Sequence, residues 1–403
     1  MESSFRSADI LLPTNVELDK WSVIACDQFT SDRAYWDRVQ ARAAHTKSTF
    51  NMVFPEIDLE NNPKERIASI AQAMEANYLS DTFKCYPNSF VYVERTLLNG
   101  DIRPGIVGMV DLEQYHYDPA NKPAIGATEQ TVLERVPPRI AVRREALLEF
   151  PHIILFCNDA ENTLMRPVTE IKDQLPLLYD FDLMEGGGHI SGWLISGDAA
   201  TALQNQIDIY QRNAVGTALL VADGNHSLVT AKCWYEELKE KNPGVDLSAH
   251  PARYALVELE NILDPSISFE PIHRVIFDTD PEKLLTDIAQ ICSDEGCVIP
   301  WYIGDKKGSI CIDVPKGQLP VAVLQTFLDK WLSENAGKID YIHDNDAVET
   351  FAKQEHAIGL LLPVFDKSEL FAFGASGKIL PRKTFSLGHG REKRYYLEGR
   401  RIK

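Results

Sequence analysis

The chain has 403 residues, a formal net charge of −18 and an ordinary globular composition, with 44% hydrophobic and 25% charged residues. Its length suffices for two or three domains, or for one large α/β unit. The acidic charge argues against nucleic acid as a partner of the whole surface. No stretch approaches the roughly 18 apolar residues that span a bilayer, and no basic region precedes an apolar core at the N-terminus. We therefore expect no membrane segment and no signal peptide.

Several catalytic and metal-binding patterns are missing from the sequence. Its seven cysteines are odd in number and form no C-x-x-C pair, so we predict neither a zinc site nor a disulfide framework, and a reducing cytoplasmic location. H-E-x-x-H and G-x-S-x-G are also absent, which leaves zincin and α/β-hydrolase functions without support.

The N-terminal third begins with a predicted strand–loop–helix unit. The apolar run 21–26 ends at Asp27 and Gln28, and apolar residues at helical spacing follow from Tyr35, so polar groups stand at the junction. The pattern next predicts a helix over 63–80. A hairpin is then expected from the apolar segments 90–97 and 105–112.

The middle of the chain predicts a short helix over 141–148, a buried strand over 151–157 and a second hairpin from 179–184 and 189–195. The E-G-G-G between the last two segments favours a flexible tip over a phosphate loop, because it lacks the lysine and the following helix of such a loop.

The segment T-A-L-L-V-A-D-G-N-H-S-L-V-T-A-K, 217–232, is the most informative part of the sequence. It predicts a strand, a tight turn at Asp223-Gly224 and a helix, whose first amides lack internal partners and can bind an anion. Capping of the helix by Asp223, Asn225 or Ser227 is the alternative interpretation. Capping does not explain the imidazole of His226. A triad of Asp223, His226 and a serine is discounted, because the three lie too close together in one turn to align.

The last third alternates between predicted strands and helices. Strands are expected over 254–261, 271–277, 309–314, 339–343 and 358–364, and helices over 281–292, 321–335 and 347–353. This order predicts an α/β fold with mixed sheets and helices on their faces. A proline-rich stretch at 242–270 suggests two subdomains packed as one compact unit. We predict residues 1–255 as the α/β region that carries the D-G-N-H motif, and residues 256–403 as a second α/β region with a basic tail.

An arginine-rich stretch at 126–145 is a second candidate for anion binding. It contains Arg135 and Arg139, with Glu129 nearby, and arginine suits bidentate recognition of phosphate. Pro137-Pro138 predicts an extended backbone, so that the two arginines do not share a helix face. A salt-bridged surface is the alternative.

Two further segments are ambiguous. His273-Arg274 lies in an apolar strand, where a histidine is often a bonded core residue rather than a ligand. Lys383 follows a proline near two hydroxyl residues, and either binds phosphate or begins the basic tail. Eight basic and two acidic residues lie between 382 and 403, so we predict that this tail docks onto the acidic body.

A-D-G-N-H-S at 222–227 resembles the D-G-H-H-R motif of domain-of-unknown-function family 1015, whose members are sometimes labelled ParB-like. The resemblance covers nearly the whole chain. It includes V-I-A-C-D-Q-F-T at 23–30, A-T-E…E-R-V-P-P-R at 127–139, P-H-I-I-L-F at 151–156, P-I-H-R-V-I at 271–276 and L-P-R-K-T-F at 380–385.

The family motif is similar to that of the ParB/sulfiredoxin-like superfamily, which includes nucleotide-binding partition proteins, sulfiredoxins and free-serine kinases. There the motif sits at a helix N-terminus and holds phosphates, so the resemblance implies this role for Asp223, Gly224 and His226. Asn225 replaces the first histidine of the motif and Ser227 replaces its arginine. Arg139 or Lys383 would then neutralise the phosphate charge.

The first hypothesis is an enzyme that acts on a small anionic or phosphorylated ligand, most concretely a small-molecule phosphotransferase of free-serine-kinase type with ATP or ADP and Mg²⁺ as cofactors. The candidate residues are Asp27, Asp223 and His226 for catalysis, Gly224, Asn225, Ser227, Arg135, Arg139 and Lys383 for the phosphates, and Gln28, Glu129, His273 and Arg274 for the substrate. The second hypothesis is a non-enzymatic ParB-like module that recognises an anionic metabolite or a protein partner. DNA binding is a third option that the acidic charge opposes.

Overall fold

A computed structural model describes residues 3–30, 32–59, 63–118, 121, 123–129, 136–381 and 383–403. The chain forms two compact units: the first comprises Met1–Ile267, Ser368–Ile379 and Gly390–Lys403, and the second comprises Ser268–Lys367 and Leu380–His389. The predicted mixed α/β class is confirmed. This grouping differs from a simple division at residue 255, because the end of the chain returns to the first unit.

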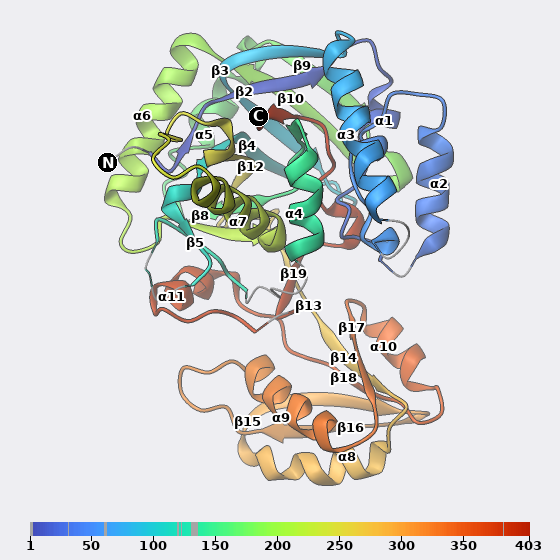
Figure 1. Ribbon diagram of the computed structural model, residues 1–403. Coiled ribbons are helices and arrows are strands. Elements are labelled where there is room, and N and C mark those ends of the chain that lie inside the picture. Colours follow the sequence, from blue (N-terminus) through green and yellow to red (C-terminus); the bar gives the residue numbers. More distant parts are fainter. Residues whose placement is uncertain are drawn as a thin grey trace. The chain divides into compact units, whose positions relative to one another are not determined.

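The first unit is built on a large mixed sheet with the strand order β5-β6-β11-β8-β12-β4-β3-β10-β9, to which β1 and β2 add at β4 and β3 (Figure 1). Its strands are β1 Phe5–Arg6, β2 Ala8–Pro13, β3 Phe83–Thr96, β4 Ile102–Asp111, β5 Tyr115–His116, β6 Ile125–Gly126, β8 Ile154–Cys157, β9 Leu177–Asp182, β10 His189–Ile195, β11 Leu219–Asp223 and β12 Tyr254–Asn261. A separate short pair joins β7, Leu148–Glu149, to β20, Arg400–Arg401.

The strands next to the D-G-N-H motif are buried apolar segments. β8 pairs antiparallel with β11 and parallel with β12, and every residue of β8 is buried. Such continuous apolar runs are typical of strands covered on both faces. Both predicted hairpins are confirmed, β3–β4 with Val91 opposite Val107 and β9–β10 with Ile190 opposite Phe181.

The helices of the first unit are α1 Leu18–Trp21, α2 Arg33–Ala43, α3 Pro63–Leu79, α4 Val136–Glu145, α5 Arg166–Ile171, α6 Gly197–Asn213, α7 Asn225–Lys241 and α11 Leu370–Ala375. α7 follows β11 directly, as the sequence predicts, and α4 packs beside it (Figure 1). This pairing brings the arginine-rich segment next to the helix that carries the motif.

Two sequence predictions in this unit are wrong. Residues 21–26 form no strand: α1 ends at Trp21, and Ile24 makes only an isolated bridge to Tyr395 of the C-terminal segment. Pro137 and Pro138 do not hold an extended stretch, because they lie in the first turn of α4. A proline is tolerated there, since the amides of the first turn have no partner within the helix.

The basic C-terminal segment docks onto the sheet of the first unit, as predicted. Arg394 is 3% exposed and forms ion pairs with Glu258 of β12 and with Glu398. Arg400 pairs with Glu149 at 2.8 Å, also out of solvent. Ala25 donates its amide hydrogen to the Arg394 carbonyl at 2.9 Å, so the segment also fixes the loop that carries Asp27.

The second unit has a sheet of order β16-β15-β18-β14-β17 and a short pair of β13 with β19. Its elements are β13 Phe269–Pro271, β14 His273–Phe277, α8 Pro281–Ile288, β15 Cys292–Ile303, β16 Lys306–Ile312, α9 Pro320–Glu334, β17 Lys338–Ile342, α10 Asn345–Ala352, β18 Ile358–Leu360 and β19 Phe385–Leu387. β15 was not predicted, because Asp294, Glu295 and Gly296 interrupt its apolar alternation. In the described part of the chain, no helix is long and apolar enough to cross a membrane.

Candidate functional site

The turn between β11 and α7 requires a glycine. Gly224 has a φ of +78°, in the left-handed region that residues with a side chain rarely adopt. A Cβ atom at this position would lie 3.0 Å from the Cα of Ile153 and 3.4 Å from Cδ2 of His152. Gly224 therefore allows both the bend and the close approach of the segment that precedes β8.

The polar side chains around this turn do not cap α7. Gly224 occupies the N-cap position, and in the described part of the chain no side chain accepts a capping hydrogen bond there. Asp223 instead accepts the amide hydrogen of Gly224 at 3.0 Å. Asn225 donates to the Thr128 hydroxyl at 3.4 Å, while its own Oδ1 is buried and has no hydrogen-bond partner among the residues that the structure describes. The turn thus presents an unused buried acceptor beside the positive end of the helix.

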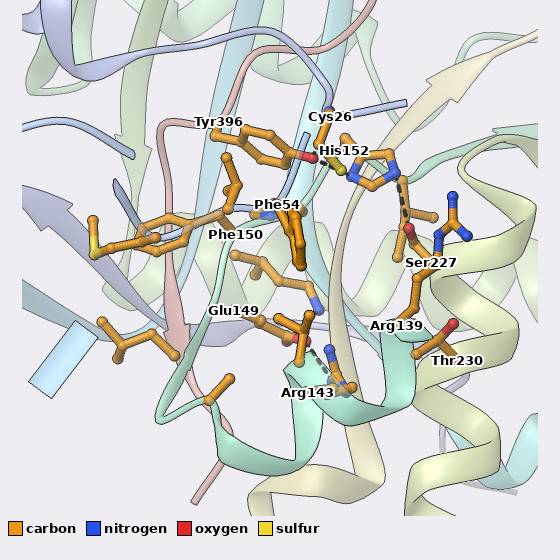
Figure 2. Close-up of a pocket in the computed structure, with 18 of the residues that line it drawn as sticks. Cys26, Phe54, Arg139, Arg143, Glu149, Phe150, His152, Ser227, Thr230 and Tyr396 are labelled. Atoms are coloured by element: carbon orange, nitrogen blue, oxygen red, sulfur yellow. Dashed lines mark hydrogen bonds and ion pairs between the residues drawn. The ribbon is translucent and has the colours of Figure 1, made fainter. Parts of the chain in front are cut away.

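His152, which the sequence did not single out, connects the motif to the rest of the site (Figure 2). Its Nε2 lies 2.8 Å from the Ser227 hydroxyl, and its Nδ1 lies 2.9 Å from the hydroxyl of Tyr396. Tyr396 accepts the amide hydrogen of Cys26 at 2.9 Å. Burial and the charge of Asp27 raise the pKa of the Cys26 thiol to about 12, so this thiol stays protonated near neutral pH.

Asp27 supplies a carboxylate to the same cluster. Its Oδ2 lies 3.9 Å from Nε2 of His152, and its Oδ1 accepts a hydrogen bond from the Gln28 amide at 3.1 Å. Burial acts to raise the pKa of Asp27, but the positive charge that His152 carries when protonated, the Gln28 hydrogen bond and the charge of Lys393 together lower it. Asp27 is therefore an ionised carboxylate with 29% of its side chain exposed.

Lys393 places a buried cation beside the motif. Its side chain is 8% exposed, and its Nζ lies 3.2 Å from Oδ2 of Asp223. The sequence predicted a docked basic tail without indicating where its charges lie. Neither Lys393 nor Tyr396 was a candidate, because no local pattern distinguishes them from the other residues of the tail.

A cavity of about 150 Å³ opens next to this cluster (Figure 2). Its polar lining includes Cys26, Glu56, Arg139, Arg143, Glu149, His152, Ser227, Thr230 and Tyr396, and most of its remaining wall is apolar, with Met52, Val53, Phe54, Leu59, Met74, Val142, Ala146, Leu148, Phe150, Pro151, Ile153 and Leu256. In Figure 2 the Arg143–Glu149 ion pair lies away from the end of the cavity that is lined by Tyr396 and His152. Arg139 pairs with Glu56 at 2.8 Å.

The structure brings part of the predicted residue set together. Asp27, Gln28, Asp223, Gly224, Asn225 and Ser227 lie in the His152–Lys393 cluster or next to it, and Arg139 lines the cavity. His226 is half-buried, does not line the cavity, and accepts a hydrogen bond from Thr230 through its carbonyl oxygen. Arg135 lies outside the described residues, and Glu129 is the last residue described before it.

Three predicted residues belong to the second unit, where they bond to their own surroundings. His273 is 2% exposed and accepts the Leu362 amide hydrogen at 3.0 Å. Arg274 is fully buried and donates to Gln325 at 2.7 Å and to the carbonyl oxygen of Lys383 at 3.1 Å. These contacts favour the core interpretation of His273-Arg274. Among the residues that the structure describes, no group of three or more His, Cys, Asp or Glu side chains is arranged to hold a metal ion.

The comparisons with known proteins support the family that the motifs indicate. A family model described as "Protein of unknown function (DUF1015)" matches residues 10–373. The chain belongs to this family. No curated protein matches the sequence.

Several solved structures share low similarity with the chain. A C-terminally truncated SbnI from Staphylococcus aureus is 10% identical, with a TM-score of 0.38, and the match covers 70% of this chain and 82% of that chain. A mutant of the free serine kinase in complex with AMP is 13% identical, with a TM-score of 0.40 and coverages of 73% and 90%. A conserved hypothetical protein from Pyrococcus furiosus is 11% identical, with a TM-score of 0.34 and coverages of 72% and 90%. A proposal of function therefore has to rest on the residues of the site.

Proposed function

We propose that this protein binds a small phosphorylated ligand at the start of α7 and acts as a nucleotide-dependent small-molecule phosphotransferase. One observation carries the proposal: the uncapped start of α7 lies among an ionised carboxylate, Asp27, and a buried cation, Lys393, which come from opposite ends of the chain. Phosphoryl transfer depends mainly on positioning and on neutralisation of the phosphate charge, and these groups supply both.

The phosphate end of the ligand has a defined place in this proposal. The start of α7 lies at the positive end of the helix dipole, which attracts phosphate oxygens, and the Ser227 amide there already donates to the Gly224 carbonyl at 3.0 Å. Lys393, whose Nζ forms an ion pair with Asp223, neutralises the charge of the phosphate. Arg139 is a second cation for this ligand, since it lines the adjacent cavity from α4.

Asp27 is the base in the proposed reaction. A general base must be deprotonated and must reach the hydroxyl that receives the phosphoryl group. Asp27 satisfies the first condition through its lowered pKa, and its partly exposed carboxylate leaves room for an incoming hydroxyl. The side-chain amide of Gln28 holds one oxygen of this carboxylate in place through a hydrogen bond.

The carboxylates of the site fit a nucleotide-bound Mg²⁺ ion. Mg²⁺ commonly binds one or two protein carboxylates together with substrate phosphates, rather than a complete cage of protein ligands. Asp223 is the carboxylate beside α7 that would hold the ion, which leaves Asp27 as the base. The ion would supply charge neutralisation on the transferred phosphoryl group.

Isothermal titration calorimetry with ADP, ATP and GTP, each with and without Mg²⁺, tests the proposal. We expect at least one nucleotide to bind with a Kd well below 1 mM, and Lys393→Ala to weaken that binding. Lys353→Ala is the control, because Lys353 is an exposed lysine of the second unit. A Kd of 1 mM or weaker for all three nucleotides would overturn the proposal.

A non-enzymatic module that recognises an anionic metabolite or a protein partner is the second candidate. It is favoured by Ser227 in place of the arginine of the family motif, since this change removes a phosphate-binding cation. Asp27→Asn separates the two candidates. A module would keep its ligand and have no turnover to lose, whereas the phosphotransferase would keep nucleotide binding and lose phosphoryl transfer to an acceptor.

A further inference from the structure

The cavity beside α7 contains a row of hydrogen-bonded groups that phosphoryl transfer to a bound acceptor does not use. Ser227, His152 and Tyr396 lie in that order at 2.8 Å and 2.9 Å, and all three line the cavity (Figure 2). A hydroxyl bonded to an imidazole that a third group orients is the arrangement that activates a nucleophilic serine. His152 is 75 residues from Ser227 in the sequence. It can therefore align with the serine, whereas Asp223 and His226 lie too close to Ser227 in one turn to form a triad with it.

The contacts of Tyr396 allow the proton arrangement that such a serine requires. The Tyr396 hydroxyl oxygen accepts the amide hydrogen of Cys26 at 2.9 Å, and it lies 2.9 Å from Nδ1 of His152. In the tautomer of His152 that carries its proton on Nδ1, this oxygen also accepts the Nδ1 hydrogen. Nε2 of His152 then has a free lone pair, which accepts the Ser227 hydroxyl hydrogen.

The cavity that the serine faces suits an apolar group of limited size. Its volume of about 150 Å³ is similar to that of an apolar cavity that holds one benzene molecule. Phe54, Val142 and Phe150 contribute apolar wall next to the polar end. A short hydrocarbon chain bound there would bury its surface while the group attached to it meets Ser227.

We propose that Ser227 is the nucleophile of a second activity, the hydrolysis of carboxylic esters with a short apolar acyl chain. Ser227 Oγ attacks the ester carbonyl carbon, and its proton passes to Nε2 of His152. The carbon–oxygen bond to the alcohol breaks, and the alcohol leaves with that proton. Water then attacks the acyl–serine ester, gives one proton to His152, and releases the carboxylic acid as the proton returns to Ser227.

Two neighbouring electrostatic features, the Asp27 carboxylate and the positive end of α7, favour these reaction steps. The Asp27 carboxylate lies 3.9 Å from Nε2 of His152, so it stabilises the imidazolium that forms when Ser227 loses its proton. Ser227 lies in the first turn of α7, where the positive end of the helix stabilises negative charge that develops on the attacked carbonyl. Tyr396 acts through His152 and is a positioning residue.

A fluorophosphonate probe and a series of p-nitrophenyl esters test the proposal on the full chain. We expect one probe adduct, located on Ser227 by peptide mass spectrometry. Ser227→Ala and His152→Ala should each lower ester hydrolysis by about 100-fold or more. Ser333→Ala is the matched control, because Ser333 is exposed in the second unit and should leave the rate unchanged. Circular dichroism checks that each variant is folded.

Acyl-chain length tests the role of the cavity. The rate should peak at about four to six acyl carbons and fall for octanoate, and Ala146→Phe should move the peak to acetate by filling the apolar part. Tyr396→Phe should keep the adduct, lower the rate and shift the acid limb of the pH–rate profile. An unlabelled Ser227, or a folded Ser227→Ala variant that hydrolyses the esters at the wild-type rate, overturns the proposal. Neither readout uses a nucleotide, so its failure is separate from a failure of the proposed phosphotransferase.

Discussion

Replacement of Gly224 by alanine is a sharp test of how the site is built. The substitution places a Cβ on a residue whose φ is +78°, which costs about 1–2 kcal/mol in the left-handed region. That Cβ also lies 3.0 Å from the Ile153 Cα and 3.1 Å from Ile153 Cγ1, and overpacking of this kind costs about 1–3 kcal/mol. We expect Gly224→Ala to lower the free energy of unfolding by about 2–5 kcal/mol.

The matched control is Gly244→Ala, just beyond the end of α7. Gly244 has a φ of +85°, and a Cβ added to it would have no atom within 4 Å, so the substitution there adds backbone strain alone. We expect it to cost about 1–2 kcal/mol. Urea unfolding of both variants measures the difference between their free energies of unfolding. The transition to follow is that of the first unit, because this unit contains both glycines. Equal losses would refute the close packing of the turn against the segment before β8.

Three further predictions concern charges in the first unit. Lys393→Ala should weaken ADP binding by about 10-fold, which corresponds to the loss of one charged contact worth about 1.4 kcal/mol. Lys353→Ala should leave the affinity for ADP unchanged. Equal affinities of the two variants in calorimetry would contradict the role of Lys393. Arg400→Ala should lower the free energy of unfolding by about 3–5 kcal/mol, because it leaves Glu149 buried with one partner fewer. Arg401 is the exposed neighbour of Arg400, and in the same urea experiment Arg401→Ala should change the free energy of unfolding by less than about 0.5 kcal/mol. Burial, opposed by the charge of Arg103, raises the pKa of Glu260 to about 8. The folded chain therefore keeps a proton on Glu260 that the unfolded chain loses above about pH 4.5. The free energy of unfolding should consequently fall as the pH rises from about 4.5 to 8. Glu260→Gln should flatten that fall, and an unchanged pH dependence of urea unfolding would contradict it.

Local patterns predicted the elements around the motif well. The D-G pair indicated the positive φ of Gly224, and the apolar spacing on either side indicated β11 and α7. The alternation over residues 254–261 predicted β12 with its observed bounds. These features depend on neighbours within a few positions, so they can be predicted from a single sequence.

The site itself depends on contacts that sequence spacing does not encode. His152 precedes a buried strand, where a histidine has the same local pattern whether it is a core residue or a ligand. Lys393 and Tyr396 reach α7 only because the C-terminal segment docks through the buried pairs of Arg394 and Arg400. Pro137 was misinterpreted, since a proline ends a helix at one position and begins it at another.

A crystal structure of the chain grown with ADP and Mg²⁺ tests the central claim most directly. We expect phosphate oxygens to lie within hydrogen-bond distance of the start of α7 and of the Lys393 Nζ, with Asp27 beside the terminal phosphate. An ADP molecule bound elsewhere on the chain, with the start of α7 unoccupied, would contradict it.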